Sequence, residues 1–408
     1  MMSPISKERN FAQPLNDSLK ELMKNPMFRF LLVLTIASNG GFQIWRTIFN
    51  NFAVEISKVD GAQMGIINSA REIPGFLAFA AIYVILVIKE YRLAALSILL
   101  LGVGILLTGY MPSYAGLIFT TIVMSVGFHY FETTNQSLTI QYFDKKLSSV
   151  VMGRLRGATG LSSLVATGMV YLLMYYLNYA QTFLVSGLLV ALIGIWALFE
   201  NPTDKNIVPQ AKKIVLKKKY WVFYILTCLS GARRQIFTVF AIFLMVEHFR
   251  FSVSEVTTLF MINNVVNFFL GPAIGKAINS WGERKLLSIE YVALIAVFVG
   301  YALIDSKLAI GILYVVDSLF FNFDIAIRTY FQKIGEKADF ASTMAVGFTI
   351  NHIIAVALPA IGGYLWLMNY QYPFWIGAVL SVAALGFAQV IKIEHANEAE
   401  GRGVSLDK

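Results

Sequence analysis

Residues 157–199 read GATGLSSLVATGMVYLLMYYLNYAQTFLVSGLLVALIGIWALF and contain no charged side chain. As a single helix this stretch would be roughly 65 Å long at a rise of 1.5 Å per residue. That is about twice the ~30 Å hydrocarbon thickness of a bilayer. The stretch therefore predicts two membrane-spanning helices that are separated by a break at residues 178–181. Residues 340–391 show the same pattern and predict a break at residues 369–373.

The composition of the whole chain agrees with a membrane environment. The 408 residues are 57% hydrophobic and 14% charged, whereas soluble chains carry about 25% charged residues. This composition indicates a polytopic α-helical membrane protein and excludes a disordered chain, a coiled coil and a conventional nucleic-acid binder. The single cysteine, Cys228, excludes a disulfide framework and a cysteine-based metal site. Residues 1–27 are too highly charged for a cleaved signal peptide.

The same length and hydropathy test, applied along the chain, predicts twelve transmembrane helices. The predicted spans are residues 28–54, 62–88, 93–110, 114–142, 149–176, 180–199, 220–247, 254–278, 286–305, 308–333, 341–366 and 373–393.

Lys and Arg residues predict the orientation of these spans, because basic residues in short loops stay on the cytoplasmic side. With both termini cytoplasmic, 25 of the 33 basic residues lie in cytoplasmic segments or in the ends of spans that border them, three lie in outer loops, and five lie deeper within spans. The excess of basic residues thus follows from topology and contact with anionic lipid, and needs no nucleic-acid partner. The predicted segments are a cytoplasmic N-terminal segment (1–27), a six-helix bundle (28–199), a basic cytoplasmic linker (200–219), a second six-helix bundle (220–393) and a cytoplasmic tail (394–408).

An internal repeat supports the division into two bundles. Shifting the chain by 192 residues aligns Gln43 with Gln235, Glu55 with Glu247, and Glu132 with Asp324. A nearly constant offset across several spans is typical of a duplicated six-helix unit.

The loop after the eighth predicted span reads GKAINSWGERK, residues 275–285. It is similar to the loop signature of the major facilitator superfamily of secondary transporters, although Asn279 occupies the acidic position of that signature. Together with the six-plus-six arrangement, the chain resembles this superfamily over essentially its whole length. The resemblance implies that spans 1, 4, 7 and 10 line a central cavity and that spans 3, 6, 9 and 12 face lipid.

Ionisable residues within the spans are candidates for proton coupling, because charges in the hydrocarbon region are costly unless they face the interior and are paired or hydrated. Glu132 could carry a proton or pair with Arg46 or Arg234. Asp324 could pair with Arg328 four residues along the same helix, or act with Glu132 across the repeat axis. The predicted proton-coupling residues are Glu132, Asp324, His129, His352 and Glu72.

Arginines within the spans are candidates for substrate binding, because a guanidinium matches carboxylate, phosphate or sulfonate groups. The alternative is that they pair with the intramembrane carboxylates. Arg233 and Arg234 cannot both satisfy a partner on one helix face, since adjacent residues project about 100° apart. Amides such as Asn263 could bind solute or form interhelical hydrogen bonds. The predicted substrate-binding residues are Arg46, Arg234, Trp45, Gln43, Arg71, Asn263, Asn267, Arg328 and Asn351.

These features predict a secondary active transporter with alternating access for a small anionic or zwitterionic organic solute, coupled to protons or sodium. The alternatives are an efflux pump for drugs or amphiphiles on the same fold and, more distantly, an integral membrane enzyme with a lipid-like substrate. The sequence contains no nucleotide-binding P-loop and no metal-ligand spacing, so we expect neither an enzyme nor a cofactor. We further expect a monomer in a bacterial inner membrane, surrounded by lipid.

Overall fold

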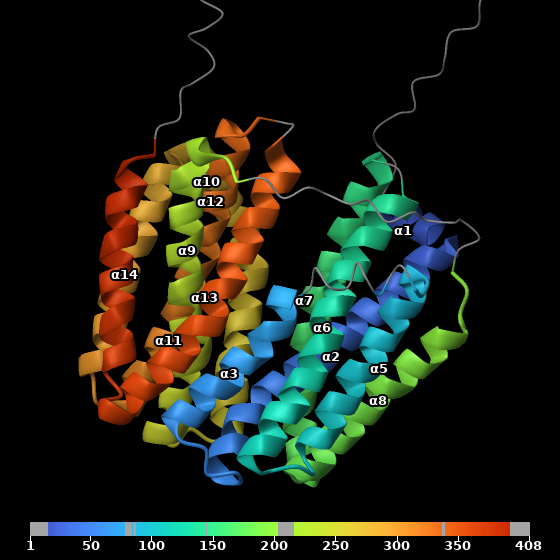
Figure 1. Ribbon diagram of the computed structural model, residues 1–408, viewed down its shortest axis with the longest axis horizontal. Helices are drawn as coiled ribbons and strands as arrows, with labels where there is room; N and C mark the ends of the chain where they lie inside the picture. Colours follow the sequence, from blue (N-terminus) through green and yellow to red (C-terminus); the bar gives the residue numbers. More distant parts are fainter. Residues whose placement is uncertain are drawn as a thin grey trace, which may run out of the picture.

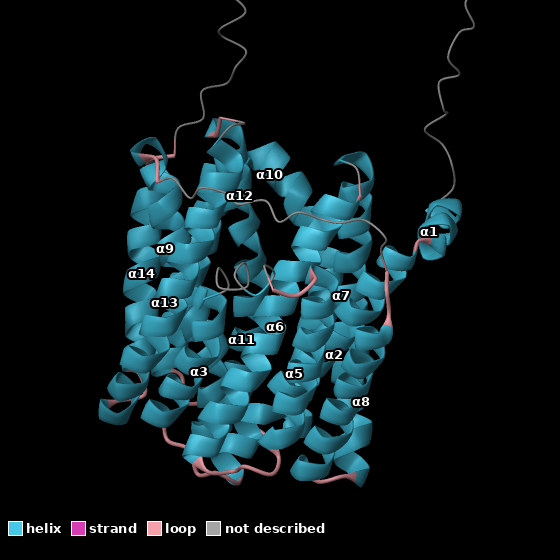
Figure 2. Ribbon diagram, turned by 45° about the vertical axis from the view of Figure 1, so that its right-hand side comes forward, coloured by secondary structure: helices cyan, strands magenta, loops and turns pink. Residues whose placement is uncertain are grey.

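The computed structural model describes residues 15–391, apart from residues 78–83, 85–86, 144, 203–215 and 337–338. All regular structure in this part of the chain is helical (Figure 2). The helices of the first half are α1 (Leu15–Lys24), α2 (Pro26–Glu55), α3 (Gly61–Phe76), α5 (Glu90–Thr108), α6 (Tyr114–Tyr142), α7 (Lys145–Tyr176) and α8 (Tyr179–Phe199). Those of the second half are α9 (Trp221–Gln235), η3 (Ile236–Ala241), η4 (Leu244–His248), α10 (Val253–Leu303), α11 (Lys307–Phe321), η5 (Asn322–Asp324), α12 (Ile325–Ile334), α13 (Phe340–Met368) and α14 (Tyr372–Gln389), preceded by the short 3₁₀ turn η2 (Lys218–Tyr220).

Both predicted breaks in the charge-free stretches are confirmed. Asn178 separates α7 from α8: its side chain accepts a hydrogen bond from the Gln181 backbone N–H at 3.0 Å, and the Gln181 side chain accepts one from the Asn178 N–H at 3.1 Å. This reciprocal capping box satisfies backbone donors that a helix start leaves free. Helices α13 and α14 are separated at residues 369–371.

Ten of the described helical segments are long and apolar enough to cross a membrane. They coincide with ten of the twelve predicted spans. The other two predicted spans are represented by α3, which is followed by residues outside the described set, and by the first part of α10. In α10 the backbone leaves helical geometry at Gly282, with φ 74° and ψ 161°, which lies within the predicted loop between spans 8 and 9. The total of twelve spans therefore stays a prediction.

The helices form two groups that follow the order of the chain (Figure 1). Helices α2 and α5–α8 lie on one side, and α9–α14 lie on the other. Within the first group α5 packs against α6 and α8, and within the second α10 packs against α11 and α14. Helix α3 of the first half packs extensively against α13 of the second. We call the boundary between the two groups the seam.

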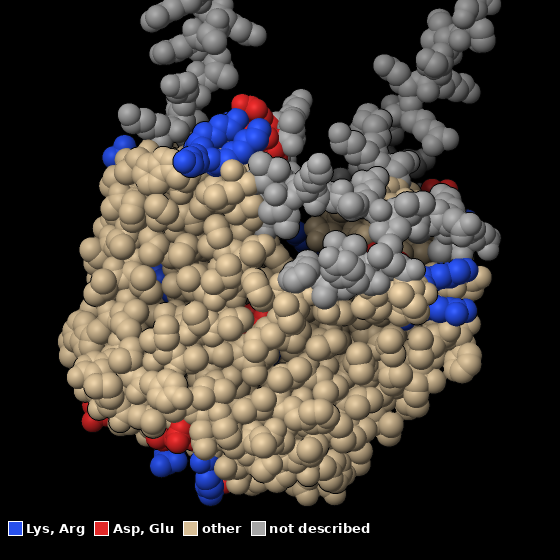
Figure 3. Space-filling model, viewed as in Figure 1, with Lys and Arg blue, Asp and Glu red and all other residues tan. Residues whose placement is uncertain are grey.

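Charged side chains gather at the two ends of the molecule, and a band of uncharged surface separates them (Figure 3). One end carries α1, Lys217–Lys219 and the end of α12, and we call it the basic end. The opposite end carries the loops after α2, α5, α7 and η4, and we call it the short-loop end. Between the two ends α8 exposes Leu188, Leu189 and Leu192, as expected for a helix that faces lipid.

Two helices of the second half depart from regular α geometry. Residues 236–241 and 244–248 form π-helical turns directly after Arg233 and Arg234. Residues 322–324 form a 3₁₀ turn between α11 and α12. Single π turns often occur at functional sites, where they reposition side chains. The corresponding helices of the first half, α2 and α6, are continuous.

Candidate functional site

The two helix groups are in close contact at the short-loop end through glycines of α3 and α13. A Cβ at Gly65 would lie 2.2 Å from the Pro359 carbonyl oxygen, and one at Gly363 would lie 2.6 Å from the Gly61 carbonyl oxygen. Gly61 and Gly65 are four residues apart, the small-xxx-small spacing that allows membrane helices to approach closely. The seam is therefore tightly packed along these two helices.

Hydrogen bonds also cross the seam at the short-loop end. The Asn51 amide donates to the Phe251 carbonyl oxygen at 2.8 Å, and the Tyr171 hydroxyl donates to the Ser254 carbonyl oxygen at 3.0 Å. Deeper in the protein, the Asn264 amide donates to the Thr167 hydroxyl at 3.2 Å. These contacts connect α2 and α7 to the second half.

The seam is open toward the basic end. On α7, Cβ atoms added at Gly153, Gly157 and Gly160 would have no neighbour within 4 Å. The molecular surface is hollowed between the helix groups at this end, with basic and acidic atoms inside the hollow (Figure 3). Among the described residues, the two helix groups are therefore in contact at the short-loop end and are separated by a hollow at the basic end. We call this hollow the central space.

An ion pair from α3 lies at the closed end of this space. The Arg71 guanidinium and the Glu72 carboxylate are 2.8 Å apart, and both side chains are largely buried. The other oxygen of Glu72 lies 3.5 Å from Nδ1 of His352 on α13. Glu72 thus links the two halves electrostatically.

Two histidines meet across the seam. The rings of His129 on α6 and His352 on α13 are 5.3 Å apart and nearly perpendicular, and Gly75 packs against both. Nδ1 of His129 lies 3.7 Å from the carboxylate of Glu132. The Glu132 side chain is 56% exposed, so it faces the central space. The predicted group of Glu72, His129, Glu132 and His352 is brought together at one place.

Arg46 and Arg234 also reach the seam, and among the described side chains neither forms an ion pair with a carboxylate. The Arg234 guanidinium donates to the Asn351 side-chain oxygen at 2.7 Å. Arg46 extends from α2 into the second half, where its guanidinium carbon lies 5.2 Å from the centre of the Phe260 ring. It also interacts with the Tyr314 hydroxyl. These two arginines retain hydrogen-bonding capacity for an anion.

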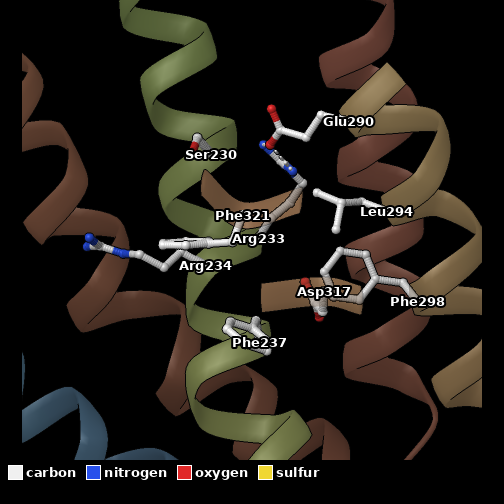
Figure 4. Close-up of a pocket in the computed structure, with 9 residues that line it drawn as sticks. All are labelled: Ser230, Arg233, Arg234, Phe237, Glu290, Leu294, Phe298, Asp317 and Phe321. Atoms are coloured by element: carbon white, nitrogen blue, oxygen red, sulfur yellow. Dashed lines mark hydrogen bonds and ion pairs between the residues drawn. The ribbon is translucent and has the colours of Figure 1, made fainter. Parts of the chain in front are cut away.

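Arg233 leaves α9 in the opposite direction from Arg234 (Figure 4). Both of its terminal nitrogens donate to one oxygen of Glu290 at 3.2 Å, and its guanidinium lies 4.6 Å from the centre of the Tyr291 ring. The cavity beside this pair has a volume of about 10 Å³, enough for about one water molecule. This cavity is too small for an organic solute. Arg233 is therefore paired with Glu290 within its own bundle and is not available to a solute.

Several predicted site residues lie elsewhere. Trp45 is 3% exposed and donates to the Thr108 hydroxyl at 3.3 Å within the first bundle, so it does not form the floor of the central space. Gln43 is buried and donates to Thr167 at 3.1 Å. On α10, Asn263 is buried, and Asn267 accepts a hydrogen bond from Asn322 at 2.7 Å. Gln43 and Asn267 therefore form interhelical hydrogen bonds, which for Asn267 was the alternative to solute binding.

The predicted ion pair between Asp324 and Arg328 is absent from the described chain. Asp324 accepts a hydrogen bond from the Ser230 hydroxyl on α9 instead, and Arg328 is exposed. Asp324 has helical backbone angles and directly precedes α12, so the two residues do lie one turn apart; the pair is absent because the Asp324 side chain bonds to Ser230 and the Arg328 side chain extends to the surface. Asp324 therefore differs from its repeat partner Glu132, which faces the central space from a continuous helix.

Three residues that the sequence did not single out contribute to these clusters. Glu290 is the charged residue inside the otherwise apolar ninth predicted span. A single charge in such a span indicates a buried partner on another helix, and Arg233 is that partner. Phe260 and Tyr314 contact Arg46, but aromatic residues are too frequent in this chain to mark them. Among the described residues, no three His, Cys, Asp or Glu side chains converge to hold a metal ion.

The fold and the site together define a multi-pass helical membrane protein with a polar space between two helix groups. The family model of the Major Facilitator Superfamily matches residues 27–333, and the chain therefore belongs to this superfamily. Its members and its structural relatives are transporters rather than enzymes. Comparison with curated proteins gave no match.

Solved structures with this fold include the nucleoside transporter NupG, with a TM-score of 0.72 and 16% identity over 89% of this chain and 98% of NupG. A point mutant of NupG has the same TM-score and identity and covers 90% of this chain and 100% of that one. A bacterial homologue of the human lysosomal transporter Spinster, in an inward-facing and occupied conformation, has a TM-score of 0.68 and 13% identity over 93% of this chain and 97% of that one. At these identities the likeness concerns the fold.

Proposed function

We propose that this protein is a monomeric secondary active transporter that carries a small anionic or zwitterionic organic solute by alternating access, in a cycle coupled to protons. The observation that carries this proposal is the pair Arg46 and Arg234. Both arginines lie at the seam without a carboxylate partner among the described residues, one from each half.

The physical argument rests on the cost of a charge at membrane depth. A guanidinium in the hydrocarbon region costs at least ~2.5 kcal/mol on insertion scales, and a carboxylate or phosphate that binds it through two hydrogen bonds offsets this cost. A solute with such a group could contact Arg46 and Arg234 together and so bridge both helix groups. Binding between two moving halves is the arrangement that alternating access requires.

The orientation follows from the basic residues. Because the basic end carries the linker lysines, we place it in the cytoplasm, most simply that of a bacterial cell with the protein in the inner membrane. The central space would then be open to the cytoplasm, and the tightly packed α3–α13 contact would close the outer side. Solute release or uptake at the outer face requires these two helices to separate.

Proton coupling is proposed for the group of Glu72, His129, Glu132 and His352. These residues connect α3 and α6 of the first half with α13 of the second. A proton taken up by Glu132 would weaken its attraction to Arg234, which lies within electrostatic range. Protonation would thus favour a conformation with different contacts across the seam. A bound proton shifts the equilibrium between two conformations only if it binds one of them more tightly.

The test is solute flux in proteoliposomes under an imposed pH gradient. A thermal-shift screen first identifies the solute, because a ligand that binds the native protein raises its apparent stability. The panel should include organic acids, phosphate esters, amino acids, amphiphilic drugs and, because one structural neighbour is named a nucleoside transporter, nucleosides. Stabilisation by amphiphilic cations and not by anions would contradict the assignment to Arg46 and Arg234.

Coupling is then tested with Glu132→Gln, against Glu200→Gln as an exposed control. We expect Glu132→Gln to abolish flux driven by the pH gradient while solute exchange at equal pH continues, and Glu200→Gln to behave as wild type. If neither the substitution nor a protonophore changes the flux, coupling through Glu132 is wrong.

A further inference from the structure

The bundle of the second half contains a cluster of ionisable residues that is separate from the central space. Arg233 on α9 is 4% exposed, Glu290 on α10 is 1% exposed, and Asp317 on α11 is 2% exposed. The three side chains line the same small cavity (Figure 4). The transport cycle described above does not use them.

The charges in this cluster do not balance if every group is ionised. Arg233 directs both terminal nitrogens to Glu290, so these two residues neutralise each other. Asp317 remains as a second carboxylate with no ion pair among the described residues. An ionised carboxylate that is buried without a partner is strongly destabilising, and such a group neutralises itself by binding a proton.

Few hydrogen-bonding groups surround Asp317. Oδ2 of Asp317 and the Tyr301 hydroxyl are both buried without a hydrogen-bond partner in the structure, although the two groups lie close enough to interact. The Tyr301 hydroxyl can donate to Asp317 in either protonation state, but it is one donor, and an ionised carboxylate presents about four acceptor sites. The cavity of about 10 Å³ next to Asp317 has the size of one water molecule.

We infer that Asp317 binds a proton in this conformation and forms a second proton-binding site, within the bundle of the second half. The cluster of Arg233, Glu290 and Asp317 is then neutral. The cavity that Asp317 lines is also lined by Arg234, whose side chain extends to the seam. A water molecule in a cavity of this size would lie between Asp317 and Arg234 and would connect Asp317 with the side of the protein that faces the central space.

Charged and titratable groups face Asp317 from three sides, and Arg233 and the Tyr301 hydroxyl are the two that would favour an ionised carboxylate. Arg233 directs both terminal nitrogens to Glu290, so its charge is already balanced, and the single Tyr301 hydroxyl does not replace the water that an ionised carboxylate loses on burial. The hydroxyls of Tyr301 and Tyr314 are neutral at physiological pH. The inference rests on this charge balance and not on the proposed function, so each can fail without the other.

Infrared spectroscopy of the purified protein tests the assignment directly, because a protonated carboxyl has a C=O stretching band that a carboxylate lacks. At neutral pH we expect Asp317→Asn to lose the intensity of one carboxylic acid per molecule relative to wild type. The matched control is Asp305→Asn, at an exposed loop position, which should leave the band unchanged. In D₂O the band assigned to Asp317 should shift in the folded protein, because the cavity water exchanges its proton.

The opposite results are equally clear. An acid band that is as strong in Asp317→Asn as in wild type would overturn the inference. An Asp317→Asn protein that fails to fold would also overturn the inference. An amide has the shape and the neutral charge of a protonated carboxyl, so it should replace a protonated Asp317 at little cost in stability. A high cost is expected only if Asp317 is ionised. A band that does not shift in D₂O would overturn the connection through the cavity.

Discussion

Arg233 and Arg234 are neighbours in the sequence, and their side chains have different partners. Arg233 points into its own bundle, is 4% exposed and is held by Glu290 and the Tyr291 ring. Arg234 points to the seam and donates to the neutral Asn351. Adjacent helical residues project about 100° apart, and this rotation alone separates a structural charge from one that is available to a ligand. A charged residue within the membrane can therefore be assigned to structure or to ligand binding only after its partner in the fold has been identified.

The same contrast extends to the residues around each arginine. The buried cluster of Arg233 lies inside one bundle and should stay intact when the two halves move. The central cluster around Arg234 contains residues of both halves and should be rearranged by any such movement.

The largest expected effect is on stability, from Arg233→Leu. This change leaves Glu290 buried without its partner, and breaking a buried ion pair costs about 3–5 kcal/mol. We expect a markedly lower apparent melting temperature and yield in detergent. The double substitution Arg233→Leu/Glu290→Leu should recover most of the loss, because replacing a whole buried pair with apolar residues is often neutral. A double variant that is as unstable as Arg233→Leu would contradict this account.

The second effect is on solute affinity, from Arg234→Gln. Removing a hydrogen bond to a charged group costs about 1.5–3 kcal/mol, which corresponds to a KM for the solute that is roughly 10- to 100-fold higher. The melting temperature without solute should change little, in contrast to Arg233→Leu. Arg234→Lys keeps the charge but loses the planar fork, and its KM should lie between those of wild type and Arg234→Gln. An unchanged KM in Arg234→Gln would remove the difference between the two arginines.

The sequence predicted the transmembrane helices well and the partners of the charged residues poorly. Breaks such as that at Asn178 depend on local hydropathy and capping, which the sequence contains. The partner of Arg233 is Glu290, 57 residues away, and pairing at that separation depends on how α9 and α10 are rotated and packed. Trp45 was predicted at the site because it is next to Arg46, but adjacent helical positions face different directions. Glu132 and His129, which share one face of a continuous helix, were placed correctly together.

A third prediction concerns the conformation of the seam. The accessibility of Arg234 depends on whether the seam is open, whereas the accessibility of Arg233 does not. Gly65→Ala places a methyl group 2.2 Å from the Pro359 carbonyl oxygen. Overpacking of this kind costs about 1–3 kcal/mol and would shift the equilibrium toward the conformation in which α3 and α13 separate. Gly153→Ala is the control, because its methyl group meets no atom within 4 Å.

The measurement is the reaction of a single cysteine with a membrane-impermeant maleimide, in a background with Cys228→Ser. A cysteine introduced by Gln136→Cys, one turn from Glu132 toward the basic end, should react from that side. The reaction should become slower with Gly65→Ala and remain unchanged with Gly153→Ala. Equal rates in all three backgrounds would show that α3 and α13 do not control access to the central space.

The smallest effect is expected for an ion-pair cluster outside the membrane, which extends the comparison to a site where water is close. Asp339 at the start of α13 pairs with Lys217, accepts a hydrogen bond from the Tyr220 hydroxyl at 2.8 Å, and lies 3.2 Å from Lys219. The hydrogen-bonded pair with Lys217, followed by the bond from Tyr220, lowers the pKa of Asp339 from 3.8 to about 2.

A carboxyl whose pKa is lower in the folded state stabilises the protein above its unfolded pKa and loses this contribution as the pH falls through the folded value. The contribution of Asp339 should therefore be complete above about pH 4 and decrease toward pH 2. We expect Asp339→Asn to lower the melting temperature slightly at pH 7 and to have a smaller effect as the pH approaches 2. Because Lys217 and Lys219 are partly exposed and screened by solvent, the decrease should be well below that of Arg233→Leu. A difference in melting temperature between wild type and Asp339→Asn that is the same at both ends of this pH range would show that the ion pair with Lys217 does not contribute to stability. The contrast between fully buried and partly exposed charge pairs would then rest on Arg233 alone.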